Sequence, residues 1–87
     1  MSRFRLRGGG LHWVESDGEI VALDDRSLHY LSANPAGASL WRALVEGATR
    51  NELIGRLLEE FEVEHAVAAR DVDAYLAELT RLGLLEA

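Results

Sequence analysis

The chain has 87 residues, of which 48% are hydrophobic, and nine basic residues stand against fifteen Asp and Glu residues for a net charge of −6. This length provides for one domain with a single hydrophobic core and leaves no room for two. Because the chain contains no cysteine, it can form no disulfide, no thiolate metal site and no thiol nucleophile.

The N-terminus is basic, with Arg3, Arg5 and Arg7 alternating with other residues before three consecutive glycines. The alternation is compatible with a frayed strand or a basic arm, but the glycines favour a flexible tail over residues 1–10. The segment lacks the apolar core of a signal peptide, and no apolar run approaches the ~20 residues that span a bilayer. We therefore expect a cytoplasmic protein with no membrane partner, whose single domain occupies residues 11–87.

Three short strands are predicted next, over residues 11–14, 19–23 and 28–33. The first two should form a hairpin, because Asp17 and Gly18 tolerate the backbone conformations of a tight turn. Side chains alternate along a strand, so the third strand places Leu28 and Tyr30 on one face and His29, Leu31 and Ala33 on the other.

Three helices are predicted for the rest of the chain, over residues 35–45, from Thr49 to about residue 61, and over residues 65–82. Asn34 is a good N-cap and Pro35 a good first residue for the first helix. Thr49 and Glu52 have the spacing of a capping box at the start of the second. Gly83 fits the residue that ends the third.

No set of side chains has the pattern of a catalytic or metal site. The histidines His12, His29 and His65 lie far apart in the sequence and in different predicted elements, so no shared metal site is expected. Asp71 and Asp73 are two residues apart on a helix and point in different directions, so no acid–base pair is expected. The sequence therefore predicts neither an enzyme activity nor a metal or other cofactor.

The order of the elements and several short motifs resemble the PqqD-like family, which includes the peptide-recognition domains (RiPP recognition elements) of ribosomally made, modified natural products. The resemblance begins with Ala33-Asn34-Pro35-x-Gly37-x-x-Leu40-Trp41, which is similar to the family's Leu-Asn-x-x-Gly/Ala-x-x-Ile-Trp. It continues through Gly47, Thr49, Glu52-Leu53, Phe61, Val63, Asp71-Val72, Tyr75-Leu76, Leu79 and Gly83-Leu84-Leu85. Together these motifs cover residues 12–86, and Ala33 departs from the leucine that the family often has.

The resemblance implies a winged helix-turn-helix-like α+β fold, in which a three-stranded antiparallel sheet precedes three helices. It further implies that the leader peptide of a precursor adds to the exposed third strand, in the groove between that strand and the third helix. The peptide-binding positions carried over are Leu28, His29, Tyr30, Leu31 and Ser32 on the strand, and Val67, Arg70, Asp71, Ala74 and Tyr75 on the helix.

A chain of this size without a fused enzyme is similar to the stand-alone recognition proteins of lasso-peptide pathways, which deliver precursors to a separate leader peptidase. Stand-alone members of the family also serve radical-enzyme pathways such as pyrroloquinoline quinone synthesis, as peptide chaperones. The sequence favours the lasso-peptide pathway and leaves the other open.

Two further classes of function remain as alternatives: a winged-helix DNA-binding regulator and a structural or dimerisation module. Residues 36–87 carry five arginines against ten Asp and Glu residues, and neither the second nor the third predicted helix is net basic. Because a DNA-binding helix needs cationic side chains for the phosphates, a nucleic-acid partner is not expected.

Overall fold

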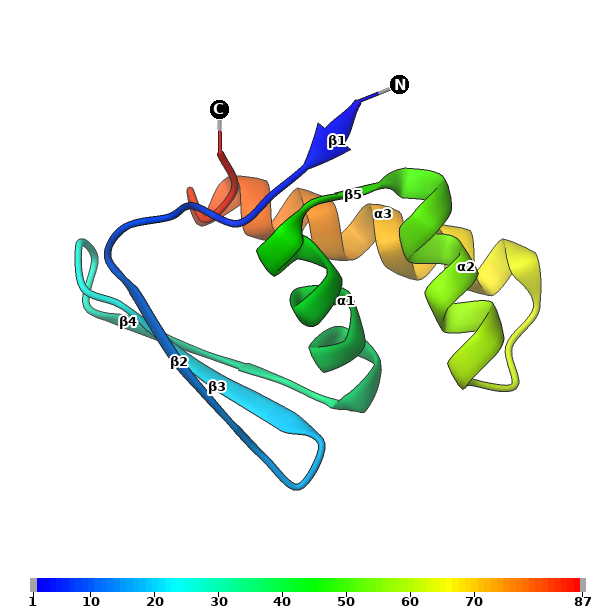
Figure 1. The fold of residues 1–87 in the computed structure, drawn as a ribbon, viewed down its shortest axis with the longest axis horizontal. Coiled ribbons are helices and arrows are strands. Elements are labelled where there is room, and N and C mark those ends of the chain that lie inside the picture. Colours follow the sequence, from blue (N-terminus) through cyan, green and yellow to red (C-terminus); the bar gives the residue numbers. More distant parts are fainter. Residues whose placement is uncertain (1, 87) are drawn as a thin grey trace.

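A computed structural model describes residues 2–86 of the chain. In chain order, the elements are β1 (Arg3–Phe4), β2 (Leu11–Ser16), β3 (Glu19–Asp24), β4 (His29–Ala33), α1 (Pro35–Glu46), β5 (Ala48–Thr49), α2 (Arg50–Glu60) and α3 (His65–Arg81) (Figure 1). Strands β2, β3 and β4 form a three-stranded antiparallel sheet in that order. The prediction of three strands followed by three helices in an α+β fold is therefore confirmed. Met1 of the predicted tail and Ala87 of the predicted domain lie outside the described residues.

The turn between β2 and β3 has the predicted two-residue form. Asp17 and Gly18 both have positive φ angles, of 53° and 78°, as a tight turn between twisted antiparallel strands requires. Ser16 then lies opposite Glu19, and the pairing continues one to one as far as Leu11 and Asp24. The turn therefore fixes the register of the sheet and extends β2 two residues beyond its predicted end.

The helix boundaries follow the predicted capping residues. The side-chain oxygen of Asn34 accepts from the N–H of Gly37 at 2.9 Å at the start of α1. At the start of α2, Thr49 donates its N–H to Glu52 Oε1 at 2.8 Å, and the N–H of Glu52 donates to Thr49 Oγ1 at 3.2 Å. Gly83 follows α3 with a φ of 73°, a left-handed conformation that favours glycine.

One hydrophobic core joins the sheet to the three helices. Its largest fully buried apolar side chains are Trp41, Ile20, Leu44, Leu53, Leu79 and Val72. Burying each of them contributes about 1.5–3 kcal/mol relative to leaving it in water. None of the helices within residues 2–86 has the length and apolar character needed to cross a bilayer.

Residues 3–7 differ from the predicted flexible tail. β1 pairs with β5, and the chain after β1 runs past the C-terminal segment, where Leu6 forms a bridge with Leu85 (Figure 1). Leu6 is only 6% exposed, and its N–H donates to the carbonyl of Leu44 at 2.9 Å. The alternation of the first residues is thus a real strand pattern. The three glycines do not make residues 3–7 a free tail, because the Leu6 side chain is buried in the core and the Leu6 N–H is hydrogen-bonded.

Candidate functional site

β4 is an edge strand with one side open. It pairs with β3, and no other strand within residues 2–86 pairs with its opposite side. Hydrogen-bonded pairs alternate along an antiparallel ladder, beginning here with Ser16 and Glu19 beside the two-residue turn. Counted across β3, this alternation leaves the N–H and C=O groups of Tyr30 and Ser32 on the open edge.

Helix α3 lies across from this edge, and two adjoining hollows separate the helix from the strand. The first hollow has a volume of about 260 Å³, and its lining includes His29, Tyr30, Leu31, Glu78, Arg81 and Leu82. The second has a volume of about 450 Å³, and its lining includes Ser32, Ala33, Gly37, Asp71, Ala74 and Tyr75. Glu78 borders both hollows, so they form one trough, which we call the β4–α3 groove.

The groove exists because its two walls belong to different packing layers. The sheet packs chiefly against α1, and α3 packs chiefly against α2. At the second hollow, Gly37 lets the walls approach one another: a Cβ there would lie 3.2 Å from the Cβ of Ala33 and 3.4 Å from Cε1 of Tyr75. A glycine at this position therefore makes room for the Tyr75 ring.

Tyr75 presents a neutral hydroxyl within the groove wall. Its side chain is half-buried, and burial raises the pKa of the phenol to about 12. The hydroxyl oxygen is buried and has no hydrogen-bond partner within residues 2–86. A buried hydroxyl without a partner is unfavourable. Because this oxygen has almost no exposed surface, Tyr75 lines the second hollow with its ring.

The carboxylates of the first hollow are held ionised by arginines. Arg7 NH2 donates to Asp24 Oδ1 at 2.6 Å, and this hydrogen bond holds the pKa of Asp24 below its usual value. Arg81 donates to Glu78 across one helical turn, which likewise lowers the pKa of Glu78. At neutral pH the polar rim therefore consists of paired charges.

The structure brings seven of the ten predicted site residues to the groove. His29, Tyr30 and Leu31 line the first hollow, and Ser32, Asp71, Ala74 and Tyr75 line the second. Leu28 lies in the turn before β4 with a φ of 60° and an exposed side chain, so β4 begins one residue later than predicted. Val67 and Arg70 lie one to two turns before Ala74 on α3 and line neither hollow.

Groove residues in the last turns of α3 were missed by the sequence analysis. Glu78 lies four residues after Ala74, and Leu82 lies four residues after Glu78, so helical periodicity extended along the same face would have found them. Asp24 and Ser27 also line the first hollow. They belong to a polar turn whose sequence gives no sign that it meets the end of α3.

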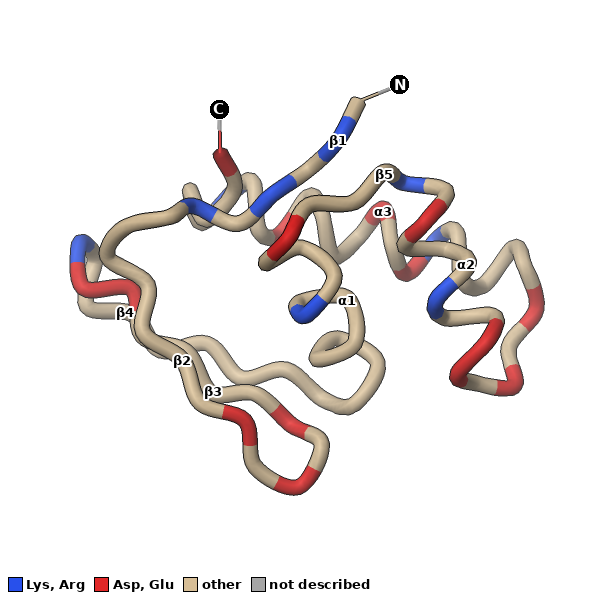
Figure 2. The backbone as a smooth tube through the Cα atoms, viewed as in Figure 1, with Lys and Arg blue, Asp and Glu red and all other residues tan. Residues whose placement is uncertain are grey.

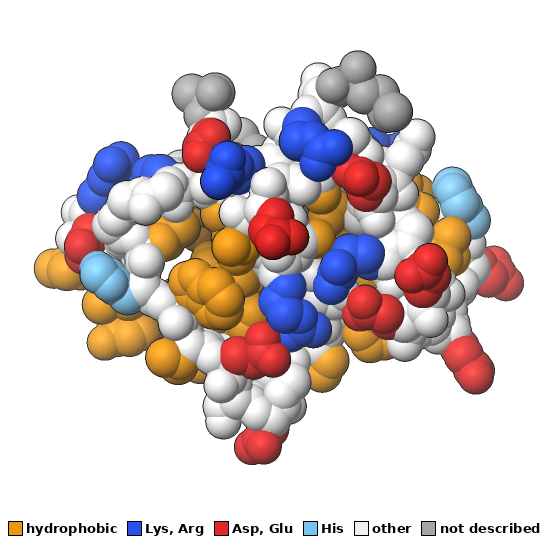
Figure 3. Space-filling model, in the orientation of Figure 1, with side chains coloured by type: hydrophobic (Ala, Val, Ile, Leu, Met, Phe, Trp, Pro, Cys, Tyr) orange, Lys and Arg blue, Asp and Glu red, His pale blue; other side chains and the backbone are white. Residues whose placement is uncertain are grey.

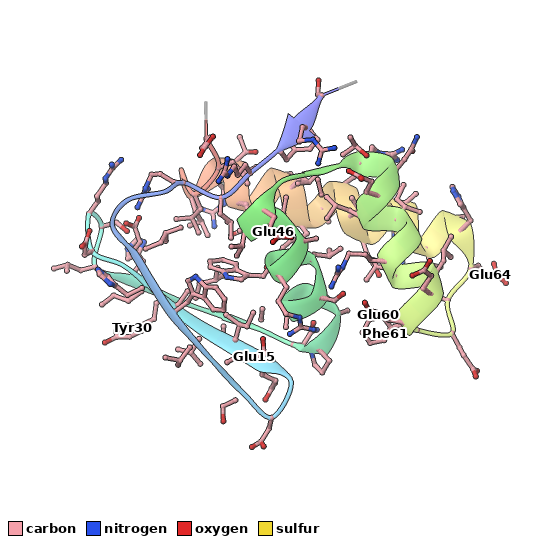
Figure 4. All side chains as sticks on the ribbon, viewed as in Figure 1. Glu15, Tyr30, Glu46, Glu60, Phe61 and Glu64 are labelled. Atoms are coloured by element: carbon pink, nitrogen blue, oxygen red, sulfur yellow. The ribbon has the colours of Figure 1, made fainter. Side chains whose placement is uncertain are left out.

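The outer face of the sheet, turned away from the helices, is partly apolar. Val14, Val21 and Tyr30 are exposed there by 67%, 46% and 77%, and Figure 4 shows Tyr30 projecting from the sheet away from the helices. In Figure 3 hydrophobic side chains gather over the sheet, whereas charged side chains of both signs gather over the helices. Tyr30 therefore stands at the border between this outer face and the first hollow.

The chemistry available in the groove is non-covalent binding. Within residues 2–86 no three His, Asp or Glu side chains converge to hold a metal ion. The groove combines an open strand edge, apolar hollows and a rim of paired charges. These features fit an extended peptide, whose main chain can pair with the strand while alternate side chains enter the hollows.

The chain is similar to known proteins in sequence and in fold. Residues 19–85 match the family model described as coenzyme PQQ synthesis protein D (PqqD). The solved structure of lasso peptide synthetase B1 complexed with the leader peptide is 31% identical, with a TM-score of 0.82 over 97% of this chain and 98% of that one. The fold also matches TbiB1 in complex with the TbiA(beta) leader peptide, at 24% identity and a TM-score of 0.85 over 95% of each chain. A search of the curated proteins finds no significant match.

Proposed function

The chain belongs to the PqqD family, and we propose that it binds the leader peptide of a ribosomally synthesised precursor and delivers it to a separate processing enzyme. The observation that carries this proposal is the open β4 edge facing α3 across two adjoining hollows. Lasso peptide synthetase B1, which is 31% identical, has been solved with a leader peptide bound.

Binding proceeds by β-strand addition to β4. The N–H and C=O groups of Tyr30 and Ser32 pair with the main chain of the peptide, which supplies affinity without reading sequence. Side chains two residues apart on the added strand are about 6.6 Å apart and point to the same face. Two such side chains can therefore enter the first and second hollows, and these supply the sequence preference.

An antiparallel peptide has a defined direction in the groove. Its N-terminal part lies at the second hollow, beside Ser32, and its C-terminal part lies at the first hollow, beside His29. A leader precedes the core peptide in a precursor, so the core leaves the groove at the β3–β4 turn. There it is accessible to an enzyme that cleaves or modifies it.

We favour a leader peptidase of a lasso-peptide pathway as the enzyme that receives the precursor. A peptide chaperone in a radical-enzyme pathway such as pyrroloquinoline quinone synthesis uses the same groove and differs in its partner. In either case the protein has no catalytic activity of its own and acts by raising the effective concentration of precursor at the enzyme, up to the millimolar range for a short tether. Any cleavage or modification of precursor by the purified protein alone would contradict this part of the proposal.

The binding proposal is tested by titrating the protein into a fluorescein-labelled leader peptide of a short precursor encoded beside its gene. Saturable binding of the leader, with no binding of the core peptide or of a scrambled leader, is the expected result. Equal binding of leader and scrambled leader would contradict recognition in the groove.

The delivery proposal makes a kinetic demand on the partner enzyme. Adding the protein should lower the apparent KM for full-length precursor and have little effect on a leaderless core peptide. A large excess should inhibit, because precursor and enzyme then occupy different copies of the protein. Equal stimulation of both substrates would instead favour allosteric activation of the enzyme.

A further inference from the structure

Arg7 connects the two walls of the β4–α3 groove, although it precedes the residues 19–85 that match the family. Its guanidinium donates from NH2 to Asp24 Oδ1 at 2.6 Å and from NH1 to the carbonyl of Gly83 at 2.8 Å. Its Nε donates to the carbonyl of Gly9 at 2.8 Å. The side chains of Arg7 and Asp24 are only 14% and 8% exposed, so this is a well-shielded ion pair.

On the sheet side, Asp24 organises the turn that leads into β4. Its carboxylate accepts from the N–H of Arg26 at 3.1 Å and from the hydroxyl of Ser27 at 3.0 Å. Its main-chain carbonyl accepts from the N–H of Leu28 at 2.7 Å. Asp24 and Ser27 also line the first hollow, so the group held by Arg7 is part of the sheet-side wall.

On the helix side, Arg7 holds the turn that ends α3. Gly83, whose carbonyl accepts from the guanidinium, lies between Leu82 and Leu84, and both leucines line the first hollow. The main-chain N–H of Arg7 also donates to the carbonyl of Leu84 at 2.7 Å. Figure 2 shows the basic N-terminal segment running past the end of α3 toward the sheet.

We propose that Arg7 is a positioning residue for peptide binding, which sets the separation of the two walls at the first hollow and so limits which side chain can enter it. This inference rests on the proposed peptide-binding function. The sheet packs chiefly against α1 and α3 packs chiefly against α2. A direct link between the sheet and α3 therefore contributes strongly to the width of the groove between them. The planar fork of arginine can reach two acceptors in fixed directions at once, which lysine cannot.

A distance measurement without peptide tests the link itself. Since the chain has no cysteine, the pair Val21→Cys and Ala77→Cys places two spin labels, one on each wall and neither in the groove. Arg7→Met should broaden the distance distribution measured by pulsed electron spin resonance. Arg5→Met is the matched control, because Arg5 lies on the same segment, is exposed, and reaches Glu86 only at 3.9 Å. An unchanged distribution in a folded Arg7→Met variant would overturn the proposal.

Binding measurements test the consequence for the peptide, using the labelled leader and a set of leader variants with alanine at each position. Arg7→Met should weaken binding about tenfold, and Arg5→Met should stay within twofold. In wild type, alanine at the peptide position that enters either hollow should weaken binding. In Arg7→Met, alanine at the first-hollow position should no longer change the affinity, whereas alanine at the second-hollow position should still weaken it. A general loss of stability would lower both sensitivities alike, and that outcome would count against positioning.

Two further variants distinguish loss of the Arg7 link from a general loss of stability. Arg7→Lys keeps the charge but reaches only one wall, so binding should fall between wild type and Arg7→Met. Asp24→Asn keeps the shape of the side chain and should reproduce the loss, with no further loss when combined with Arg7→Met. Full additivity of the two substitutions would overturn the shared role. If the wild-type protein does not bind the leader, the proposed function fails, and the distance measurement still decides whether Arg7 links the walls.

Discussion

The two outer edges of the central sheet have opposite surroundings. On the β2 edge, the Trp13 ring packs against the buried Trp41 ring with centroids 6.1 Å apart, and Glu15 accepts from Arg42 of α1 at 2.8 Å. On the β4 edge, the main chain of Tyr30 and Ser32 opens onto the groove in front of α3. Neither edge strand has a further strand partner within residues 2–86. The side chains of β2 pack against the core and α1, whereas the main chain of β4 borders two hollows in front of α3.

This difference shows what distinguishes the two unpaired edges: only β4, among the described residues, borders hollows that a helix closes on the other side. An open edge is a hazard, because it can pair with any extended chain. At β4 the helix across the groove restricts pairing to a peptide that fits between strand and helix. In the proposed binding mode, the β4 main chain would supply affinity, and the hollows, which residues of both walls line, would supply selectivity.

Proline substitution should give the largest difference in peptide affinity between the two edges. Tyr30→Pro removes a donor on the open edge and leaves a peptide carbonyl unpaired, at a cost of up to about 3 kcal/mol, which corresponds to a loss of up to about 140-fold in affinity. Glu15→Pro changes the opposite edge of the same sheet and should leave peptide affinity within twofold. Fluorescence titration of variants whose circular dichroism is unchanged measures both. Equal losses would show that the β4 edge has no special role.

Truncation of an aromatic groove residue should have the next largest effect. Tyr75→Ala removes a side chain that lines the second hollow, and losing such an anchor commonly costs about 2 kcal/mol of binding free energy. That cost corresponds to roughly a thirtyfold weaker affinity. Glu59→Ala, on α2 away from the groove, is the control and should change affinity little. Equal losses at unchanged melting temperature would exclude the second hollow as the peptide site.

Truncation on the β2 edge should instead lower stability. Trp13→Ala removes an edge-to-face aromatic pair and should cost about 1.5 kcal/mol in the free energy of unfolding. The affinity of the folded protein for the leader should stay within twofold, since Trp13 lies outside the groove. Urea unfolding and leader titration of the same sample measure the two quantities. A large loss of affinity in Trp13→Ala without a loss of stability would instead indicate that the peptide binds at the β2 edge.

Acid should weaken the ion pair at the end of the groove, with the smallest effect of the four. The pKa of Asp24 lies below its usual 3.8, so the stability it contributes is fully present above about pH 4 and is lost as the pH falls through the lowered value. The melting temperature of wild type should therefore approach that of Asp24→Asn in this acidic range. A constant difference between the two proteins from pH 7 down to pH 2 would contradict the role of the pair.

Local sequence was sufficient for most of the fold. The Asp17–Gly18 turn, the caps at Asn34 and Thr49, and the glycine after α3 each depend on neighbouring residues alone. They place the helix and strand boundaries within a few residues of their observed positions. The N-terminal strand was missed because Leu6 packs against segments that are distant in sequence.

The site was predictable in part for the same reason. Side-chain alternation put His29 and Leu31 on the same face of the strand, and the family resemblance implied Ala74 and Tyr75 on the third helix. Sequence could not show where along α3 the strand crosses. Val67 and Arg70, which the family resemblance implied, line neither hollow, whereas Glu78 and Leu82 do. That crossing depends on how the sheet, α1 and α2 pack as a unit.

Local residue patterns were enough to predict the three strands of the main sheet, the three helices, their capping residues and their buried stripes, and short motifs pointed to the family. The strands, helices and caps follow from periodicity and from hydrogen bonds between neighbouring residues, whereas the family resemblance rests on short sequence motifs. Tertiary packing sets the position of the open β4 edge opposite the last turns of α3, and it also brings Arg7 between the two walls. Both depend on residues more than 40 positions apart in the chain, whose meeting is set by the shape of the whole core and not by any one segment.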